Sequence, residues 1–472
     1  MTGPSALVKV EQASRAAMNA PSARPTAGLS DGVLGDVAQR FGTPLYVFDE
    51  RALAERTAFL RASLPQGVGL CYAMKANTFV LPQLSPLVDR VEVCSPGEYR
   101  ICRTVGVPQG RLVISGVHKD EATVAAALAD AAQPATVTIE SEAQMRLVDQ
   151  LAQRFGLRVP VLLRLTSANQ FGLDACKVRE LAGRYLRATH IELRGVQYFS
   201  GTQKTSAKRI GREIEKLDRF LASLEQECGW RAPEFEYGPG LPVAYFEADA
   251  FDERSLLVQI GRHLQEMSFT GDIVLEVGRS LVASCGTYLT SVVDTKCNRG
   301  QRYAIVDGGT HQLVYFGQSM AMRQPSCRLL RPGTPGEAGA DRDHAACERV
   351  AGSPAADART TCDHAAGDPA ADTPATCDGL ASAPDSEREL WNVFGSLCTV
   401  NDVLAKQMPL CGLREQDVLA FSNAGAYCAT EGIALFLSRD LPRVVVLDRA
   451  GEPHVVRDAL RTDPLNTPSS FR

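Results

Sequence analysis

The sequence of 472 residues contains no apolar run that approaches the roughly 20 residues of a membrane-spanning helix. It also lacks a basic excess, because 50 basic side chains are set against 55 acidic ones and the net charge is −5. Proteins that bind nucleic acid through its phosphates depend on such an excess. The composition therefore predicts that neither a membrane nor a nucleic acid is a partner.

Signatures of metal binding are missing as well. None of the 14 cysteines forms a CxxC pair and no HExxH stretch occurs, so no metal site is predicted. Single cysteines scattered along a long chain are typical of reduced thiols, which favours a cytoplasmic protein. The N-terminal stretch has no apolar core of a secretory signal, and its polar composition predicts a disordered leader over residues 1–30.

A regular alternation of short β-like runs with helix-like segments follows the leader. The runs are, in order, "GVGLCYAMK", "RVEVCS", "RLVISG", "ATVTIE", "VPVLLRL", "IELRGVQYFS", "EFEYG" and "DIVLEVG". Eight strands that alternate with helices are the content of a (β/α)8 TIM barrel. The sequence therefore predicts an α/β fold with such a barrel over residues 49–285.

Short strands with few helices between them predict a separate C-terminal β domain over residues 286–460, followed by a tail over 461–472. Residues 31–48, which include "PLYVF", are expected to form an N-terminal strand that joins this domain. Residues 331–388 are rich in Ala, Asp, Pro and Gly and carry a decaying repeat, which predicts a disordered low-complexity insertion. A Cys/His metal site within that insertion is the alternative.

Polar residues at the ends of the predicted strands indicate a binding site, because barrel enzymes react at the C-terminal strand ends. Lys75 ends the first strand, and Glu276 and Arg279 end the eighth. Glycine-containing turns end the sixth and seventh strands, and exposed amides of such turns bind phosphate. An amine, a carboxylate and a phosphate nest at one mouth match pyridoxal phosphate. Taken singly, the lysine could be a solvated strand end and the Glu276–Arg279 pair a local ion pair.

Several motifs in a fixed order carry a resemblance to a known family. They are "GTPLYVFDE", "YAMKAN", "SPGEYR", "EVGR", "VDGG", "GSLCTVND" and "NAGAY". From about Phe41 to about Asp448, apart from the insertion, the chain resembles the fold-type III pyridoxal-phosphate-dependent decarboxylases, the diaminopimelate, ornithine and arginine decarboxylase group. The resemblance implies decarboxylation of an amino acid by a homodimer with shared active sites and pyridoxal 5'-phosphate as cofactor.

The resemblance also implies roles for single residues. Lys75 is expected to form the Schiff base with the cofactor, and Cys398 to return a proton from the partner subunit, with a buried structural thiol as the alternative for Cys398. The other cysteines, Cys94 among them, are expected to be packing residues, and His311 a polar loop residue. The remaining cofactor-binding residues are expected to be Arg164, Phe199, Thr202, Gly238, Gly240, Glu276, Gly278, Arg279 and Tyr427.

Three positions depart from the family pattern. Phe199 stands where a histidine usually stacks on the cofactor ring, and Pro239 removes an N–H from the glycine turn. Thr399 stands where an acidic residue usually holds a distal ammonium group. "CTxxD" resembles a subgroup of specialised biosynthesis, so a carrier-protein-tethered aminoacyl group or a siderophore intermediate is an alternative substrate. The same barrel could also serve an amino-acid racemase or a non-catalytic decarboxylase-like regulator.

Overall fold

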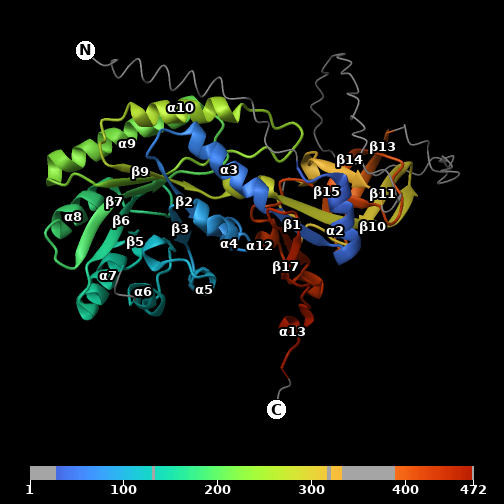
Figure 1. The fold of residues 1–472 in the computed structure, drawn as a ribbon, viewed down its shortest axis with the longest axis horizontal. Helices are drawn as coiled ribbons and strands as arrows, with labels where there is room; N and C mark the ends of the chain where they lie inside the picture. Colours follow the sequence, from blue (N-terminus) through green and yellow to red (C-terminus); the bar gives the residue numbers. More distant parts are fainter. Residues whose placement is uncertain (1–27, 130–132, 316–319, 332–387, 470–472) are drawn as a thin grey trace, which may run out of the picture.

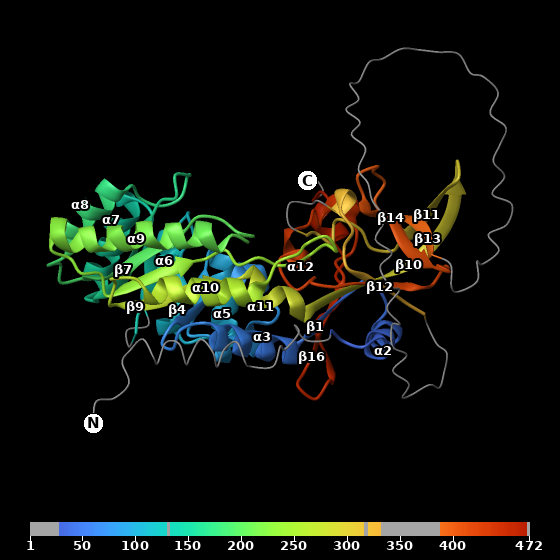
Figure 2. The ribbon, with the colours of Figure 1, turned by 90° about the horizontal axis from the view of Figure 1, so that it is seen from above.

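A computed structural model describes residues 28–129, 133–315, 320–331 and 388–469. The chain forms a barrel and a sheet domain that lie next to each other along the longest axis (Figures 1 and 2). Most of the predicted leader, and the predicted insertion apart from its two end residues, lie outside the described residues. No helix in the described part of the chain is long and apolar enough to cross a membrane.

The eight predicted barrel runs form a closed parallel barrel, which confirms the fold class. Strand β9 pairs with β2, and Leu70 opposite Leu275 closes the ring. Most residues of these strands are buried, as is usual for parallel strands that are covered on both faces. The strands are β2 (Gly69–Ala73), β3 (Arg90–Val93), β4 (Leu112–Ile114), β5 (Thr136–Ile139), β6 (Val159–Leu165), β7 (Ile191–Phe199), β8 (Glu234–Gly238) and β9 (Asp272–Val277).

Amphipathic helices cover the outside of the barrel, as Figure 1 shows. In α9 the apolar residues recur at intervals of three or four, so that one stripe packs inward. Ser95, Ser141 and Ser206 cap α5, α7 and α9 with their hydroxyl groups. The helices are α3 (Glu50–Ser63), α4 (Leu81–Leu84), α5 (Pro96–Val105), α6 (Glu121–Leu128), α7 (Glu142–Phe155), α8 (Ala175–Tyr185), α9 (Ala207–Cys228), α10 (Glu253–Gln265) and α11 (Arg279–Val282).

The second body is a mixed sheet in the order β14-β13-β11-β10-β1-β16-β17, with β15 pairing both β10 and β12. Strand β1 comes from the N-terminal side of the barrel and lies between β10 and β16. The strands are β1 (Leu45–Asp49), β10 (Gly286–Asn298), β11 (Gln301–Val306), β12 (Cys327–Leu330), β13 (Arg388–Phe394), β14 (Val403–Cys411), β15 (Val418–Phe421), β16 (Arg443–Leu447) and β17 (Pro453–Arg457). Its short helices are α12 (Cys428–Glu431) and α13 (Asp463–Asn466).

Residues 31–41 do not belong to an N-terminal strand, contrary to the expectation from the sequence. They form helix α2 (Asp31–Phe41), whose first turn is capped by the Ser30 hydroxyl. Leu34, Val37 and Ala38 form a helical stripe that is buried. The serine cap and this spacing are signals for a helix, and the strand is limited to β1.

Two expectations about single residues of the sheet domain need correction. His311 lies in a turn, as expected, but it is 3% exposed and burial lowers its pKa to about 4, so it is a buried neutral residue. Cys297, in β10, is disulfide-bonded, whereas reduced thiols were expected throughout. Ten other described cysteines are free thiols.

Candidate active site

A cavity of about 200 Å³ lies at the C-terminal ends of the barrel strands. Strand β2 leads into a short 3₁₀ turn, Met74–Ala76, which places Lys75 in the cavity wall. Strand β7 ends at Phe199, and Glu276 is the penultimate residue of β9; both side chains line the same space. The predicted site residues that line it are Lys75, Phe199, Thr202, Gly240, Glu276, Gly278, Arg279 and Tyr427.

The amine of Lys75 is held by an acid that was not predicted from the sequence. Its Nζ donates a hydrogen bond of 2.8 Å to Oε2 of Glu92, which is 2% exposed. Burial alone would lower the pKa of Lys75, but Glu92, Cys94 and Glu276 raise it above its usual value. The amine is therefore a cation while it faces Glu92. The signal was a glutamate between two valines of a buried strand, in "RVEV".

Glu276 is a second acid of this site and is only partly ionised at neutral pH. Burial and the neighbouring Glu92 raise its pKa to about 7, against the lowering effect of Lys75. Nε2 of Gln197 donates a hydrogen bond of 2.8 Å to Oε2 of Glu276. Glu236 is buried close by and interacts electrostatically with both acids. The barrel thus holds Glu92, Glu236 and Glu276, besides the buried Glu234 at the start of β8, where the strand-end rule predicted one carboxylate.

Two glycine turns form the opposite end of the cavity. Gly240 has a φ of 65°, and a Cβ there would lie 2.0 Å from the carbonyl oxygen of Gly201. The amide of Lys204 donates a hydrogen bond of 2.9 Å to the carbonyl oxygen of Gly240, which joins the two turns. Gly238 does not line the cavity, and a Cβ there would lie 2.6 Å from a ring carbon of Phe199. Glycine is therefore needed at position 238 because any side chain there would collide with the Phe199 ring.

A polar cluster behind these turns holds them against helix α9. Nζ of Lys204 donates hydrogen bonds to Oγ of Ser200 at 2.5 Å and to Oε1 of Glu213 at 2.8 Å. The hydroxyl of Tyr237 donates to the same Glu213 oxygen at 2.7 Å. The side chains of Lys204 and Glu213 are both 18% exposed, so the ion pair is largely shielded from water.

Residues 50–283 match the family model of the pyridoxal binding domain of pyridoxal-dependent decarboxylases, and residues 360–425 match that of the C-terminal sheet domain of pyridoxal-dependent decarboxylases. The chain belongs to the pyridoxal-dependent decarboxylases. It is 26% identical to the diaminopimelate decarboxylase of Pseudomonas fluorescens over 422 residues. This alignment covers 84% of this chain and 86% of the relative. The diaminopimelate decarboxylase of Aquifex aeolicus is 27% identical over 303 residues, 60% of this chain and 70% of the relative.

Solved structures share the fold of this decarboxylase. Diaminopimelate decarboxylase from M. jannaschii in complex with L-lysine superimposes with a TM-score of 0.71 at 20% identity, over 90% of this chain and 92% of that one. A lysine/ornithine decarboxylase from Vibrio vulnificus in complex with putrescine gives a TM-score of 0.68 at 17% identity, over 88% of this chain and 98% of that one. Both superpositions include the barrel and the sheet domain.

The residues at the mouth fit the cofactor of this decarboxylase, pyridoxal 5'-phosphate. Its aldehyde requires an amine, and Lys75 supplies one. Its phosphate requires backbone amides at glycine turns, and Gly240 and Gly278 line the cavity. A carboxyl group and an aromatic face are also present, from Glu276 and Phe199.

Arg279 and Tyr427 join the sheet domain to this site of the decarboxylase. The Arg279 guanidinium lies over the Tyr427 ring, 4.5 Å from its centroid, and donates a hydrogen bond of 2.9 Å to the Tyr245 hydroxyl. Tyr427 has a φ of 66°, and its amide donates to the carbonyl oxygen of Ala76 at 2.7 Å. The segment "NAGAY" is therefore attached to the turn that carries Lys75.

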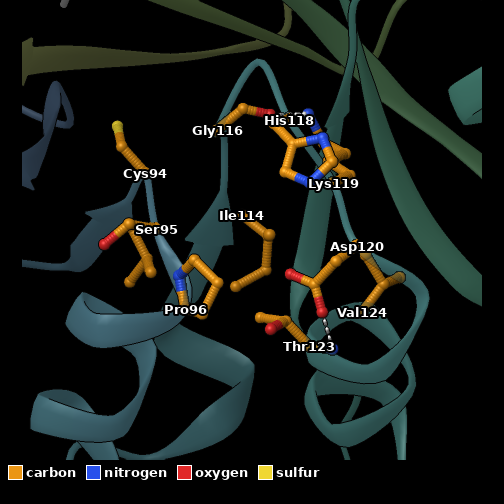
Figure 3. A pocket seen from close by; sticks show the side chains of 11 residues that line it. Cys94, Ser95, Pro96, Ile114, Gly116, His118, Lys119, Asp120, Thr123 and Val124 are labelled. Atoms are coloured by element: carbon orange, nitrogen blue, oxygen red, sulfur yellow. Dashed lines mark hydrogen bonds between the residues drawn. The ribbon is translucent and has the colours of Figure 1, made fainter. Parts of the chain in front are cut away.

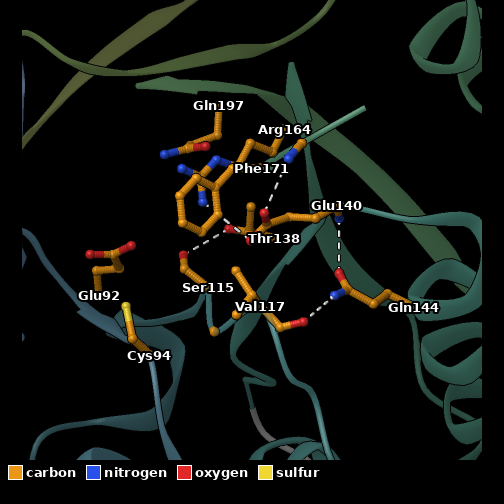
Figure 4. A network of polar contacts seen from close by, with 12 residues as sticks. Glu92, Cys94, Ser115, Val117, Thr138, Glu140, Gln144, Arg164, Phe171 and Gln197 are labelled. Atoms are coloured by element: carbon orange, nitrogen blue, oxygen red, sulfur yellow. Dashed lines mark hydrogen bonds and ion pairs between the residues drawn. The ribbon is translucent and has the colours of Figure 1, made fainter. Parts of the chain in front are cut away.

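Besides Gly238, two more predicted site residues do not line the cavity of their own chain. Arg164 forms an ion pair of 3.2 Å with Glu140 and lies over the Phe171 ring at 4.9 Å (Figure 4). Cys398 is exposed on a loop of the sheet domain. The buried carboxylate of Asp402 holds that loop by accepting a hydrogen bond of 2.7 Å from the Leu397 amide. The roles of Arg164 and Cys398 stay predictions.

Cys94 is not the packing residue that was expected. Its sulfur lies 3.6 Å from Nζ of Lys75, at the edge of a small hollow between the ends of β3 and β4 (Figure 3). Lys119 lines the same hollow, and burial lowers its pKa to about 8. The Lys119 amine donates to the carbonyl oxygen of Gly116 at 2.7 Å and to Gln144 at 3.2 Å, so these bonds hold it in the barrel wall.

Proposed function

We propose that this decarboxylase releases carbon dioxide from an amino acid of the diaminopimelate, ornithine or lysine kind. The relative matched over 84% of the chain is named diaminopimelate decarboxylase, and two proteins of the same fold hold L-lysine or putrescine. The observation that carries the proposal is that Lys75 and Glu276 line one cavity together with a glycine cradle. That set of groups matches the amine, acid and phosphate contacts that the cofactor requires.

Each side chain of the cavity has a proposed role at the cofactor. Lys75 would hold the cofactor through its aldehyde carbon, whose oxygen would leave as water, and would give up its ion pair with Glu92. Glu276 would hold a proton at the ring nitrogen, and Phe199 would cover a ring face. When bound, pyridoxal phosphate supplies an electron-accepting ring that takes up the electron pair of the bond to carbon dioxide. The phosphate would be held by Thr202, Gly240, Gly278 and Arg279.

Cys398 returns a proton to the α-carbon of the substrate, and it does so from the partner subunit of a homodimer. Two observations support this assignment. Cys398 is exposed, and it does not line the cavity of its own chain. Its loop is also held in place by Asp402, which accepts hydrogen bonds from Leu397 and from the Thr310 amide at 2.7 Å. A second copy of the chain would supply the thiol that each cavity lacks.

Thr399 supports a second candidate substrate, an aminoacyl group tethered to a carrier protein or a siderophore intermediate. The neighbour of Cys398 is a neutral hydroxyl, which cannot form an ion pair with a distal ammonium group. A substrate whose far end is an amide or an ester needs no such ion pair. The same residue would therefore favour an enzyme of specialised biosynthesis over one that acts on free diamino acids.

The test is a carbon dioxide release screen with the reconstituted protein and Lys75→Ala as the blank. The substrates are free D- and L-diamino acids, acidic amino acids and carrier-bound aminoacyl groups. Release from a diamino acid supports the first proposal, and release from a carrier-bound group alone supports the second. Inverted amino acid without carbon dioxide would instead make the protein a racemase. Bound cofactor with no reaction at all would favour a regulator.

A further inference from the structure

Four acids interact inside the barrel, Glu92, Glu234, Glu236 and Glu276, which raises the question of which one carries the negative charge at the cavity. Glu92 is paired with Lys75 at 2.8 Å, and only Glu276 lines the cavity. Glu236 is 0% exposed, and neither of its oxygens has a hydrogen-bond partner among the described residues. Burial, together with Glu276, raises the pKa of Glu236 well above its usual value. Glu236 is therefore a neutral acid.

The nearest cation, Arg90, lowers the pKa of Glu236, but by less than burial and the neighbouring glutamates raise it. Nη1 of Arg90 lies 3.8 Å from Oε2 of Glu236, beyond hydrogen-bond distance. The same guanidinium makes a two-point contact with Glu234, one bond of which measures 2.6 Å. Arg194 adds a third contact to Glu234 at 3.1 Å. The O–H of Glu236 thus remains a buried donor that needs an acceptor.

Gln197 offers that acceptor. It is 1% exposed, its Nε2 donates to Glu276 at 2.8 Å, and its Oε1 is buried without a partner within the described part of the chain. Gln197 of β7 and Glu236 of β8 are register partners on adjacent parallel strands. Side chains at paired positions of neighbouring strands point to the same face, which here is the barrel interior. The O–H of Glu236, which has no acceptor among the described residues, therefore lies at the strand position next to that of Gln197, whose Oε1 has no donor among them.

We propose that Gln197 is a positioning residue that accepts a hydrogen bond from the Glu236 carboxyl group and donates one to Glu276, so that the negative charge at the mouth stays on Glu276. This proposal rests on the proposed contact between Glu276 and the ring nitrogen. An amide has one accepting and one donating end, so its orientation fixes the direction of the relay. Glu276 then keeps Oε1 for the cavity. Figure 4 shows Gln197 above Arg164 in the barrel interior.

The relay makes a prediction about pH. The hydrogen bond from Gln197 lowers the pKa of Glu276, against the raising effects of burial and Glu92. Its loss would therefore raise that pKa above about 7, so that a larger fraction of Glu276 would be protonated at pH 7.5. The other titratable or charged groups that act on Glu276 are Lys75, Cys71, Cys94, Arg164, Glu236 and Tyr427.

The experiment titrates pyridoxal phosphate into the full-length protein without cofactor, between pH 5.5 and 9, and follows cofactor absorbance. Gln197→Met is expected to weaken binding about tenfold at pH 7.5 and to move the acid-side midpoint upward, because one hydrogen bond to a charged group is lost. Glu236→Gln keeps an N–H donor for Oε1 of Gln197. This variant is expected to retain the wild-type midpoint of the pH dependence of cofactor binding. Glu236→Leu removes that donor and is expected to shift the midpoint in the direction of Gln197→Met.

Gln259→Met, on the exposed face of α10, is the matched control for the substitution itself. Gln197→Asn shortens the amide and gives a second reading if the methionine variant does not fold. An unchanged midpoint in a folded Gln197 variant overturns the relay, and so does an equal shift in Glu236→Gln. Glu276→Gln separates the two proposals. Wild-type binding and turnover in that variant would remove Glu276 from the proposed function, whereas impaired Glu276→Gln beside normal Gln197→Met removes the relay alone.

Discussion

Glu276 shows how a single acid can lower the stability of the protein that uses it. Its pKa is about 7, against a usual value of 4.5, because burial and Glu92 disfavour the charged form. A group whose pKa is raised on folding stabilises the fold below its unfolded pKa. That contribution disappears as the pH rises through the folded pKa. The protein without cofactor therefore loses stability as the pH rises from about 4.5 to about 7.

Glu276→Gln is accordingly expected to stabilise the protein without cofactor at pH 8 and to leave it almost unchanged at pH 4.5. The amide carries no charge at either pH, so the cost of the buried anion is removed only where wild type is ionised. The gain is at most about 3 kcal/mol, the free energy of a pKa difference of about 2.5, and corresponds to a rise in melting temperature of a few degrees. Thermal unfolding at the two pH values measures it. Equal shifts at both would show that packing, and not charge, is responsible.

Two cysteines allow a direct comparison of thiols at the proposed site. Cys398→Ala is expected to bind the cofactor normally and to lose turnover by about 10²–10⁴-fold, the usual contribution of a proton donor. Cys94→Ala is the matched control, because Cys94 lies 3.6 Å from the Lys75 amine but has no proposed role. Steady-state carbon dioxide release measures both. A larger loss of turnover in Cys94→Ala than in Cys398→Ala would instead assign the donor role to Cys94 of the same chain.

The rule that barrels react at C-terminal strand ends finds candidate residues but not their contacts. It identifies Lys75, just after β2, and Glu276, the penultimate residue of β9. Glu92 is also penultimate in β3 and Gln197 lies two residues before the end of β7, but nothing in a single sequence tells which face of a buried strand they occupy. Their contacts with Lys75 and Glu276 depend on the register of the closed barrel.

At the scale of elements, helix α9 supports the phosphate turns through the ion pair of Lys204 and Glu213. Glu213→Gln is expected to weaken binding of pyridoxal phosphate about three- to tenfold, the effect of losing one shielded charged hydrogen bond. Affinity for pyridoxal, which has no phosphate, should stay unchanged. Lys177→Met removes an exposed ion pair with Glu180 on α8 and is the control. Equal losses for both ligands would mean that the whole mouth is disturbed.

The same scale explains which elements the sequence could reveal. The barrel strands are short apolar runs next to capped helices, so their number and order could be predicted. Strands β13 and β14 pair with register shifts at Trp391/Val393 and Val393/Phe394, so the regular alternation that identifies a strand is broken. Strand β14 also exposes Lys406 and Gln407 in succession. Within the described residues, β14 is an edge strand that pairs only with the nearby β13, and β13 is joined to the sheet by β11, which is distant in sequence.

In the whole molecule, each cavity is closed by two domains of one chain. The Asn77 side chain donates a hydrogen bond of 2.8 Å to the carbonyl oxygen of Gly425, beside the contact from Tyr427 to Ala76. The central position of β1 in the sheet adds a second link between the domains. The sheet domain thus fixes the Lys75 side of the cavity while its Cys398 loop stays exposed. This arrangement favours a thiol that is supplied by another copy of the chain.

Mixing two inactive variants tests that arrangement. Lys75→Ala and Cys398→Ala each disable both sites of a homodimer, if Cys398 acts in the partner's cavity. After exchange of subunits, half of the dimers are mixed and one of their two sites is intact, so about a quarter of wild-type turnover is expected. A mixture of each variant with itself is the control and should stay inactive. If Cys398 served its own chain, each mixed dimer would pair an intact Lys75 only with a missing thiol, and turnover would not recover.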